Sequence, residues 1–178
     1  MAVPYRIETP RLVIRCYDPA DAPLLKAAVD ASVEHLRPWM PWAANEPQSL
    51  EQKIELLRSF RGKFDLGQEF PFGIFSPDER EQLGSTGFHP RVGPQALEIG
   101  YWVRVEAVNR GIATESTAAL TRVAFELLKL ERLEIRCDPA NAASAAVPRK
   151  LGYRHDATLR RCIISGVEGK LRDSMVWT

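Results

Sequence analysis

The stretch that decides the fold of this chain is Leu97-Glu98-Ile99-Gly100-Tyr101-Trp102-Val103-Arg104-Val105-Glu106-Ala107-Val108-Asn109-Arg110-Gly111-Ile112-Ala113-Thr114-Glu115. Its first part is rich in aliphatic and aromatic residues, which is typical of a half-buried strand. From Glu115, leucines and alanines recur at helical spacing as far as Leu130. The pattern therefore predicts a strand over 97–105, a turn of small residues and then a helix.

The predicted turn is a candidate site for a phosphate or pyrophosphate group. It consists of Asn109, Arg110, Gly111, Ile112, Ala113 and Thr114. Such a turn leaves backbone N–H groups exposed at a helix N-terminus, where the helix dipole adds partial positive charge. No Gly-Lys-Ser/Thr follows Gly111 and no Gly-x-Gly-x-x-Gly occurs in the sequence, which excludes the two better-known phosphate loops. A plain strand-to-helix turn is the alternative interpretation.

Composition favours an ordinary globular protein. The 178 residues suffice for one domain, expected over 1–178, with a core that needs neither disulfides nor a metal. Charges of both signs are interspersed and sum to +1, so nucleic acid is not an expected partner. The cysteines Cys16, Cys137 and Cys162 are far apart, which argues against a disulfide framework or a zinc site. Without a signal-peptide pattern or a membrane-spanning apolar run, we expect a cytoplasmic protein with no membrane partner.

The rest of the chain predicts a sheet with helices packed on it. Strands are predicted over 11–15, 70–75, 83–88, 133–137, 160–165 and 171–177, and helices after Asp18, from Ser49 and from Asn141. Between residues 97 and 137 a strand, a helix and a second strand are predicted in succession. This succession predicts two parallel strands that are joined by a crossover helix. The last two strands should close the sheet as a hairpin with 166–169 as its turn.

A proline-broken segment carries two tryptophans, in the run His35-Leu36-Arg37-Pro38-Trp39-Met40-Pro41-Trp42. The prolines prevent a regular helix. Trp39 and Trp42 either fill the core or line a substrate pocket, because tryptophan combines apolar area with one polar handle. His89, at the end of the predicted hairpin, is a further candidate for contact with a substrate.

The segment 97–115 resembles motif A of the GNAT superfamily, the acetyl-coenzyme A-dependent N-acetyltransferases, written Gln/Arg-x-x-Gly-x-Gly/Ala. Gly111 and Ala113 match this motif, whereas its first position is Val108. The family binds the cofactor through this loop largely with backbone amides. The side chain of Val108 therefore weakens the match to the motif more than it weakens the expected binding. Asn141 and Ser144, followed by Lys-Leu-Gly-Tyr at 150–153, resemble motif B in the expected order and separation.

Two further runs resemble the RimJ/RimL-like branch of this superfamily, whose members acetylate the N-termini of ribosomal proteins. One is the Thr-x-Arg-Leu-x-Ile-Arg run at 9–15, and the other is the Leu-Arg-Pro-Trp-x-Pro-Trp run at 36–42. In that branch the second run lies on the acceptor side. The resemblance therefore assigns Trp39 and Trp42, and with less support His89, to the acceptor site.

The resemblance implies a single-domain α/β fold of the GNAT type. This fold is a mixed, mostly antiparallel sheet with helices on both faces, in which strands 97–105 and 133–138 splay apart. It further implies that acetyl-coenzyme A binds with its phosphates at 109–114 and its pantetheine arm near Asn141. Backbone groups of Val103 and Val105 would pair with the pantetheine amides as an added strand pairs with a sheet edge.

The implied reaction is direct attack of an amine on the thioester, with no covalent enzyme intermediate and no metal. Glu98 matches a family position that acts as a base through water, although it could instead be an ordinary solvent-facing strand glutamate. Pro148 stands where many members carry the tyrosine that protonates the thiolate, and in the RimJ/RimL-like branch a serine at the position of Ser144 is proposed for that role. Proline also leaves the carbonyl of Ser144 without its helical donor, which predicts a kinked or short helix.

The acceptor is expected to be a protein or peptide N-terminus. An α-amino group has a pKa of about 7.7–8.0, against about 10.4 for lysine, so it needs less help to become neutral. A small-molecule amine such as an antibiotic or polyamine is the alternative acceptor. A non-catalytic acyl-coenzyme A-binding module is the alternative function, and it would need Gly111 and Asn141 but neither Glu98 nor Ser144. Both a monomer and a homodimer are compatible with the sequence.

Overall fold

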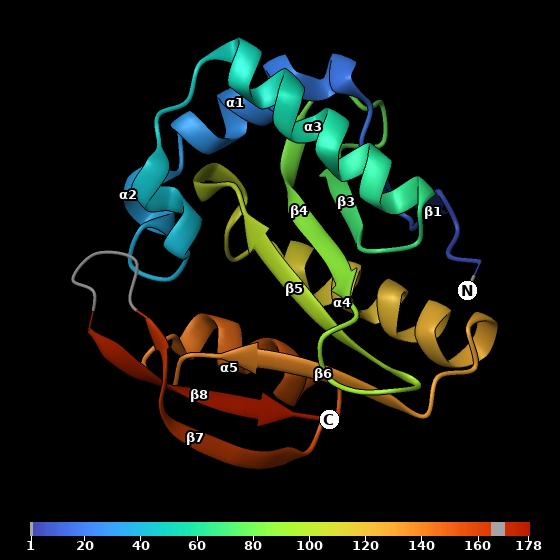
Figure 1. Cartoon of the computed structure of the whole chain (residues 1–178), viewed down its shortest axis with the longest axis vertical. Helices are drawn as coiled ribbons and strands as arrows, with labels where there is room; N and C mark the ends of the chain where they lie inside the picture. Colours follow the sequence, from blue (N-terminus) through green and yellow to red (C-terminus); the bar gives the residue numbers. More distant parts are fainter. Residues whose placement is uncertain (1, 165–169) are drawn as a thin grey trace.

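The computed structural model describes residues 2–164 and 170–178. An eight-stranded sheet runs through this part of the chain in the order β1-β2-β3-β4-β5-β6-β8-β7 (Figure 1). The strands are β1 (Arg6–Glu8), β2 (Val13–Cys16), β3 (Phe70–Phe75), β4 (Gln82–His89), β5 (Ala96–Val103), β6 (Arg132–Cys137), β7 (His155–Ile164) and β8 (Leu171–Trp177). Neighbouring strands are antiparallel except β5 and β6, which are parallel. The predicted mixed, mostly antiparallel sheet is confirmed.

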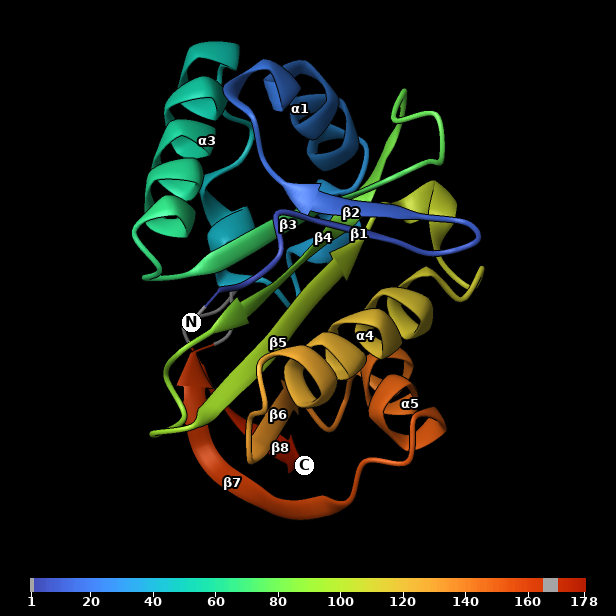
Figure 2. The same cartoon turned by 90° about the vertical axis from the view of Figure 1, so that its right-hand side faces the viewer.

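Helices cover both faces of the sheet, as expected (Figure 2). Helices α1 (Ala22–Asp30) and α3 (Leu50–Asp65) pack against each other on one face, and α4 (Ile112–Arg122) lies on the other beside α5 (Ala142–Lys150). The predicted capping box starts α3, because the Ser49 hydroxyl accepts from the Gln52 backbone while the Gln52 side chain accepts from the Ser49 backbone. The proline-broken segment forms α2 (Val33–Leu36), a turn and the 3-10 helix η2 (Pro41–Asn45).

The two faces carry separate apolar cores. The core on the α4 side joins sheet residues such as Phe88, Leu97 and Ile99 to Leu120 of α4. The core on the other side packs α1 and α3 over β2 and β3 through residues that include Tyr17, Leu25, Leu57 and Phe75. Full burial of one such large side chain contributes about 1.5–3 kcal/mol, so the sheet is held firmly from both faces.

Helix α4 begins at Ile112, earlier than the leucine pattern from Glu115 suggested. Its N-cap is Gly111, whose φ of 79° lies in the left-handed region that favours glycine. Buried residues Ile112, Ser116, Ala119 and Leu120 recur at helical spacing and seat α4 on the sheet. The crossover from β5 through α4 to β6 thereby fixes the turn 109–114 at the start of a buried helix. A π-helical turn, η4 (Val123–Leu127), continues it.

The central strands β5 and β6 separate after a short parallel pairing. Their register runs from Ala96 opposite Arg132 to Ile99 opposite Ile135. Beyond that point β5 continues along β4 to Val103, whereas β6 continues along β8 to Cys137. The predicted splay of the central pair is confirmed.

Strand β5 is shorter than predicted, because it ends at Val103 and Val105 begins the 3-10 helix η3 (Val105–Ala107). The backbone N–H of Val105 donates to the Ser32 hydroxyl at 3.0 Å. The N–H of Val105 is therefore already paired in this structure, whereas the assignment of Val105 as a backbone partner of pantetheine stays a prediction.

The C-terminal part also departs from the expected bounds. Strand β7 begins at His155, before the predicted start at residue 160, and pairs with β8 as the predicted closing hairpin. The predicted turn at 166–169 lies outside the described residues. Helix α5 runs through Pro148 to Lys150, so the proline does not end it. In residues 2–164 and 170–178, no helix has the length and apolar character needed to cross a membrane.

Candidate active site

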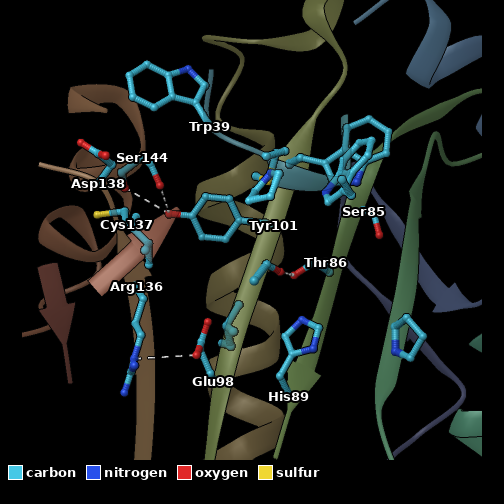
Figure 3. Close-up of a pocket in the computed structure, with 18 of the residues that line it drawn as sticks. Trp39, Ser85, Thr86, His89, Glu98, Tyr101, Arg136, Cys137, Asp138 and Ser144 are labelled. Atoms are coloured by element: carbon cyan, nitrogen blue, oxygen red, sulfur yellow. Dashed lines mark hydrogen bonds and ion pairs between the residues drawn. The ribbon is translucent and has the colours of Figure 1, made fainter. Parts of the chain in front are cut away.

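A cavity of about 850 Å³ lies where β5 and β6 separate (Figure 3). Tyr101 and Trp102 of β5 both line it, together with Thr86 and Ser85, their partners on β4. Consecutive strand residues point to opposite faces of a sheet. Accordingly Tyr101 packs against the core on the α4 side and Trp102 against the core under α1 and α3. The cavity is thus bordered by residues from both faces of the sheet.

On the α4 side, the cavity wall carries a tyrosine–serine pair. The Tyr101 hydroxyl donates to the carbonyl oxygen of Ser144 at 3.1 Å and lies 3.1 Å from the Ser144 Oγ (Figure 3). The residue four positions after Ser144 is Pro148, which has no N–H to donate back to that carbonyl. Tyr101 therefore replaces the missing helical hydrogen bond and holds the serine hydroxyl at the cavity.

Burial raises the pKa of Tyr101 well above its ordinary value of 10.0, only partly offset by the hydrogen bond with Ser144. The phenol consequently keeps its proton at neutral pH and serves as a hydrogen-bond donor. Asn141 caps the same helix, since its Oδ1 accepts from the Ser144 backbone N–H at 3.0 Å. Asn141, Ser144 and Cys137 line the cavity together. Burial also raises the pKa of the Cys137 thiol, which disfavours its thiolate.

On the opposite face, Glu98 lies in the wall of the same cavity. The residue is 4% exposed, so the interpretation as a solvent-facing strand glutamate is wrong. Arg91 donates from Nε to Oε2 at 2.9 Å and from Nη2 to Oε1 at 2.5 Å. Arg136 Nε lies 3.8 Å from Oε2. Two guanidinium groups thus hold the carboxylate in one orientation beside the cavity.

His89 pairs with Glu98 across β4 and β5 and lines the cavity near it (Figure 3). Its Nδ1 lies 3.3 Å from Oε1 of Glu69, a second carboxylate in the wall. Lys63 Nζ donates to the other oxygen of Glu69 at 2.7 Å. His89 therefore lies on the same side of the cavity as Glu98, in contact with Glu69.

The two tryptophans of the proline-broken segment line the cavity and lie outside the buried core of the described chain. The ring of Trp42 stands 5.9 Å from that of Trp102. The guanidinium of Arg172, on β8, lies 4.9 Å from the centroid of the Trp39 ring. These contacts make the segment a wall of the cavity and argue against its use as a core plug.

The side chain of Arg172 connects this wall to the residue that follows strand β6. Its Nη1 donates to the carbonyl oxygen of Pro38 at 2.7 Å, and its Nε lies 2.6 Å from Oδ2 of Asp138. Asp138 directly follows β6 and precedes the turn that carries Asn141. One side chain thereby links the tryptophan segment to the helix that carries Ser144.

The turn 109–114 lies beyond the cavity lining, at the start of α4. Asn109 and Gly111 both have positive φ, 61° and 79°. No side chain caps this helix start, and Arg11 braces the turn by donating to the carbonyl oxygen of Arg110 at 3.1 Å. Uncapped N–H groups at a helix start are the donors an anion needs. In the described residues, no group of three or more His, Cys, Asp or Glu side chains is arranged to hold a metal ion.

Sequence reasoning missed several residues of the cavity. Tyr101 lies inside the most informative stretch of the sequence, and the missing N–H of Pro148 was the signal that the Ser144 carbonyl needed another donor. Arg91 lies in the connection between β4 and β5, seven residues before Glu98, and gave no signal of this contact. Arg136 and Arg172 also gave no local signal, because their partners lie far away along the chain.

Comparison with known proteins assigns the chain to a family. The acetyltransferase (GNAT) domain model matches residues 11–154. The chain therefore belongs to the GNAT family and is an N-acetyltransferase. It is similar to the ribosomal protein uS5-alanine N-acetyltransferase of Escherichia coli (strain K12), with 24% identity over 96% of this chain and 88% of that protein.

Solved structures share the fold along nearly the whole chain. RimJ of Mycobacterium smegmatis, in complex with a CoA-disulfide, superposes with a TM-score of 0.82 and 26% identity over 93% of this chain and 80% of that chain. The microcin C7 self immunity acetyltransferase MccE, in complex with acetyl-CoA and AMP, gives a TM-score of 0.86. Its identity is 16% over 95% of this chain and 92% of that chain, so this likeness concerns the fold alone.

Proposed function

We propose that this chain, as a single catalytic domain, transfers the acetyl group of acetyl-coenzyme A to the α-amino group of a protein or peptide N-terminus. The observation that carries the proposal is the cavity where β5 and β6 separate, with the Tyr101–Ser144 pair on one face and Glu98 on the other. A thioester and an amine can approach each other there from opposite faces.

The features along β5 and α4 fit coenzyme A. The edge of β5 beyond Ile99 no longer pairs with β6, so the backbone of Val103 is available for the amides of a pantetheine arm. The uncapped start of α4 offers the N–H groups of 112–114 to the phosphates, with Asn109, Arg110 and Gly111 shaping the turn. Asn141 stands beside the cavity where the arm would end.

The reaction moves one proton from nitrogen to sulfur. The amine nitrogen forms a bond to the thioester carbon, the carbon–sulfur bond breaks, the nitrogen loses a proton and the departing sulfur gains one. Ser144, hydrogen-bonded to the protonated phenol of Tyr101, supplies the proton or hydrogen bond to sulfur. The raised pKa of Cys137 speaks against a covalent cysteine relay.

Glu98 is the proposed base and acts through a water molecule. An ionised carboxylate offers about four lone-pair sites, of which the two hydrogen bonds from Arg91 occupy two. The remaining sites can accept from a water that takes the proton of the attacking amine. Trp39, Trp42 and His89 would surround the acceptor on this face.

An N-terminal acceptor is supported by the named activity of the ribosomal-protein acetyltransferase relative. It is also supported by charge: an α-amine with a pKa of about 7.7–8.0 is partly neutral near neutral pH, whereas lysine at about 10.4 is not. A carboxylate acting through water is sufficient for the first and weak for the second.

The test combines binding and turnover. Calorimetry with acetyl-coenzyme A should detect binding, and free thiol should be released when peptides with free N-termini are added. Binding with no thiol release for any peptide or small amine would indicate a non-catalytic acyl-coenzyme A-binding module. Release with small amines alone would replace the proposed acceptor by a small-molecule amine.

A further inference from the structure

A polar cluster lies in the acceptor-side wall of the cavity, beyond the residues used for acetyl transfer. It consists of Glu46, Gln48 and Lys53, all of which line the cavity. Glu46 organises it, because Oε1 accepts from Lys53 Nζ and Oε2 accepts from the backbone N–H of Gln48 at 2.9 Å. The carboxylate of Glu46 thus contacts the ammonium group of Lys53 through one oxygen and the backbone of Gln48 through the other.

The cluster is buried and incompletely hydrogen-bonded. The side chains of Lys53 and Glu46 are 1% and 2% exposed. A lysine ammonium has three donors, and within residues 2–164 and 170–178 Glu46 is its one hydrogen-bond acceptor. The Oε1 atom of Gln48 is also buried, and the described residues give it no donor. Buried polar groups normally have hydrogen-bond partners. A ligand group that both accepts and donates would supply partners for the ammonium of Lys53 and for Oε1 of Gln48.

The chemistry of the missing group follows from the charges and the surroundings. Glu46 and Lys53 already neutralise each other, so a ligand with a net charge would bury a charge without a counter-ion, which is strongly unfavourable. The neighbouring wall is apolar and contains Leu25, Val29, Leu56, Phe60 and Trp42. A neutral amide satisfies both demands, because its carbonyl accepts while its N–H donates.

We propose that Glu46, Gln48 and Lys53 form a subsite for a main-chain amide within the first residues of the acceptor peptide. The amide carbonyl accepts from Lys53, the amide N–H donates to Oε1 of Gln48, and the adjoining peptide side chain is uncharged and packs on the apolar wall. The inference rests on the proposed N-terminal acceptor and extends it to the class of peptide. A simple amine without an amide gains nothing from this subsite.

An ester scan of an acceptor peptide with a free N-terminus tests the subsite without changing the protein. Each of the first three peptide bonds is replaced in turn by an ester, which removes the N–H donor and keeps the α-amine. One replacement should lower kcat/KM by about tenfold, because it leaves Gln48 unpaired. The penalty should vanish in Gln48→Met, in which parent and ester peptides are used equally. Gln68→Met is the matched control and should keep the full penalty, because Gln68 is an exposed glutamine that does not line the cavity.

A second series varies the side chain next to that amide. Leucine should be preferred to aspartate or lysine by at least about tenfold in kcat/KM, since a buried charge would have no counter-ion. Equal use of all esters, or the same ester penalty in wild type and Gln48→Met, would overturn the subsite while leaving N-terminal acetylation intact. Acetylation of small amines with no peptide accepted would overturn both. Melting curves for Gln48→Met exclude a folding effect as the cause.

Discussion

The Tyr101 hydroxyl lies 3.1 Å from both the carbonyl oxygen and the Oγ of Ser144, bridging β5 to α5 across the splay of the central strands. Pro148 creates the opening for this contact by leaving the carbonyl of Ser144 without a helical donor. In our account the proline removes one candidate acid from the helix and, at the same time, lets a tyrosine from the strand orient the serine that replaces it.

Tyr101→Phe should lower kcat by about 10²-fold or more, within the range of about 10²–10⁴ for general acid–base groups. The ring still packs, but Ser144 loses its hydroxyl partner and its carbonyl loses a donor. Acetyl-coenzyme A affinity, measured by calorimetry, should change little. Ser144→Ala should show a loss of similar size, and the double variant should be no worse than either single one. Fully additive losses would argue against a coupled pair.

The pH profile separates the base from the acid. Glu98→Gln should lower kcat by about 10²–10⁴-fold near neutral pH, with partial recovery as the α-amine loses its proton above its pKa of about 8. Because the pKa of Tyr101 is raised, its phenol stays protonated throughout, so no falling limb from this group is expected up to about pH 9. Tyr101→Phe should therefore show no recovery. If Glu98→Gln keeps wild-type kcat across this range with chemistry rate-limiting, Glu98 is not the base.

Gly111→Glu should abolish measurable acetyl-coenzyme A binding. The substitution puts a negative side chain at the proposed phosphate turn and strains a backbone with a φ of 79°. Gly93→Glu is the matched control, because Gly93 also has a positive φ, 113°, but lies on an exposed loop with open space around its Cβ position. Calorimetry on both variants, after a check of folding, decides the matter. If Gly111→Glu keeps its affinity for acetyl-coenzyme A, the phosphates do not bind at this turn.

The tryptophan wall should govern acceptor binding. Trp39→Ala or Trp42→Ala should raise the acceptor KM by about tenfold, equivalent to 1.4 kcal/mol, and leave coenzyme A affinity nearly intact. Arg172→Lys keeps a positive charge beside Asp138 but cannot reproduce the planar guanidinium fork that also reaches Pro38. It should raise the same KM in a smaller degree. Variants that unfold, or that lose only coenzyme A affinity, would favour a structural role for these side chains.

Local patterns in the sequence were sufficient for most of the fold. Alternation predicted the strands, helical spacing predicted α4, and the Ser49 capping box predicted the start of α3. These features depend on residues that are close to one another in the chain, so a single sequence is enough to detect them. The mostly antiparallel arrangement and the splay between β5 and β6 came from the family resemblance, since strand partners are chosen by tertiary packing.

The candidate site could be predicted only in part. Glu98, Ser144, Trp39, Trp42 and His89 do line one cavity. The pattern could not show that Arg91 and Arg136 surround Glu98, because these contacts depend on how three strands align. The predicted strand also extended too far, because β5 ends at Val103 and the backbone N–H of Val105 donates to the buried Ser32 hydroxyl. The contact of Arg172 with Pro38 joins residues far apart in the chain and has no local signature.

The most direct test of the account uses two matched peptides of one sequence that contains a single lysine. In one peptide the α-amine is free and the lysine is blocked, and in the other the lysine is free and the α-amine is blocked. Thiol release from acetyl-coenzyme A is followed, and mass spectrometry locates the acetyl group. We expect release with the first peptide and little with the second, with the acetyl group on the N-terminus. Release that needs only the lysine side chain, or none with either peptide despite bound acetyl-coenzyme A, would contradict the proposed function.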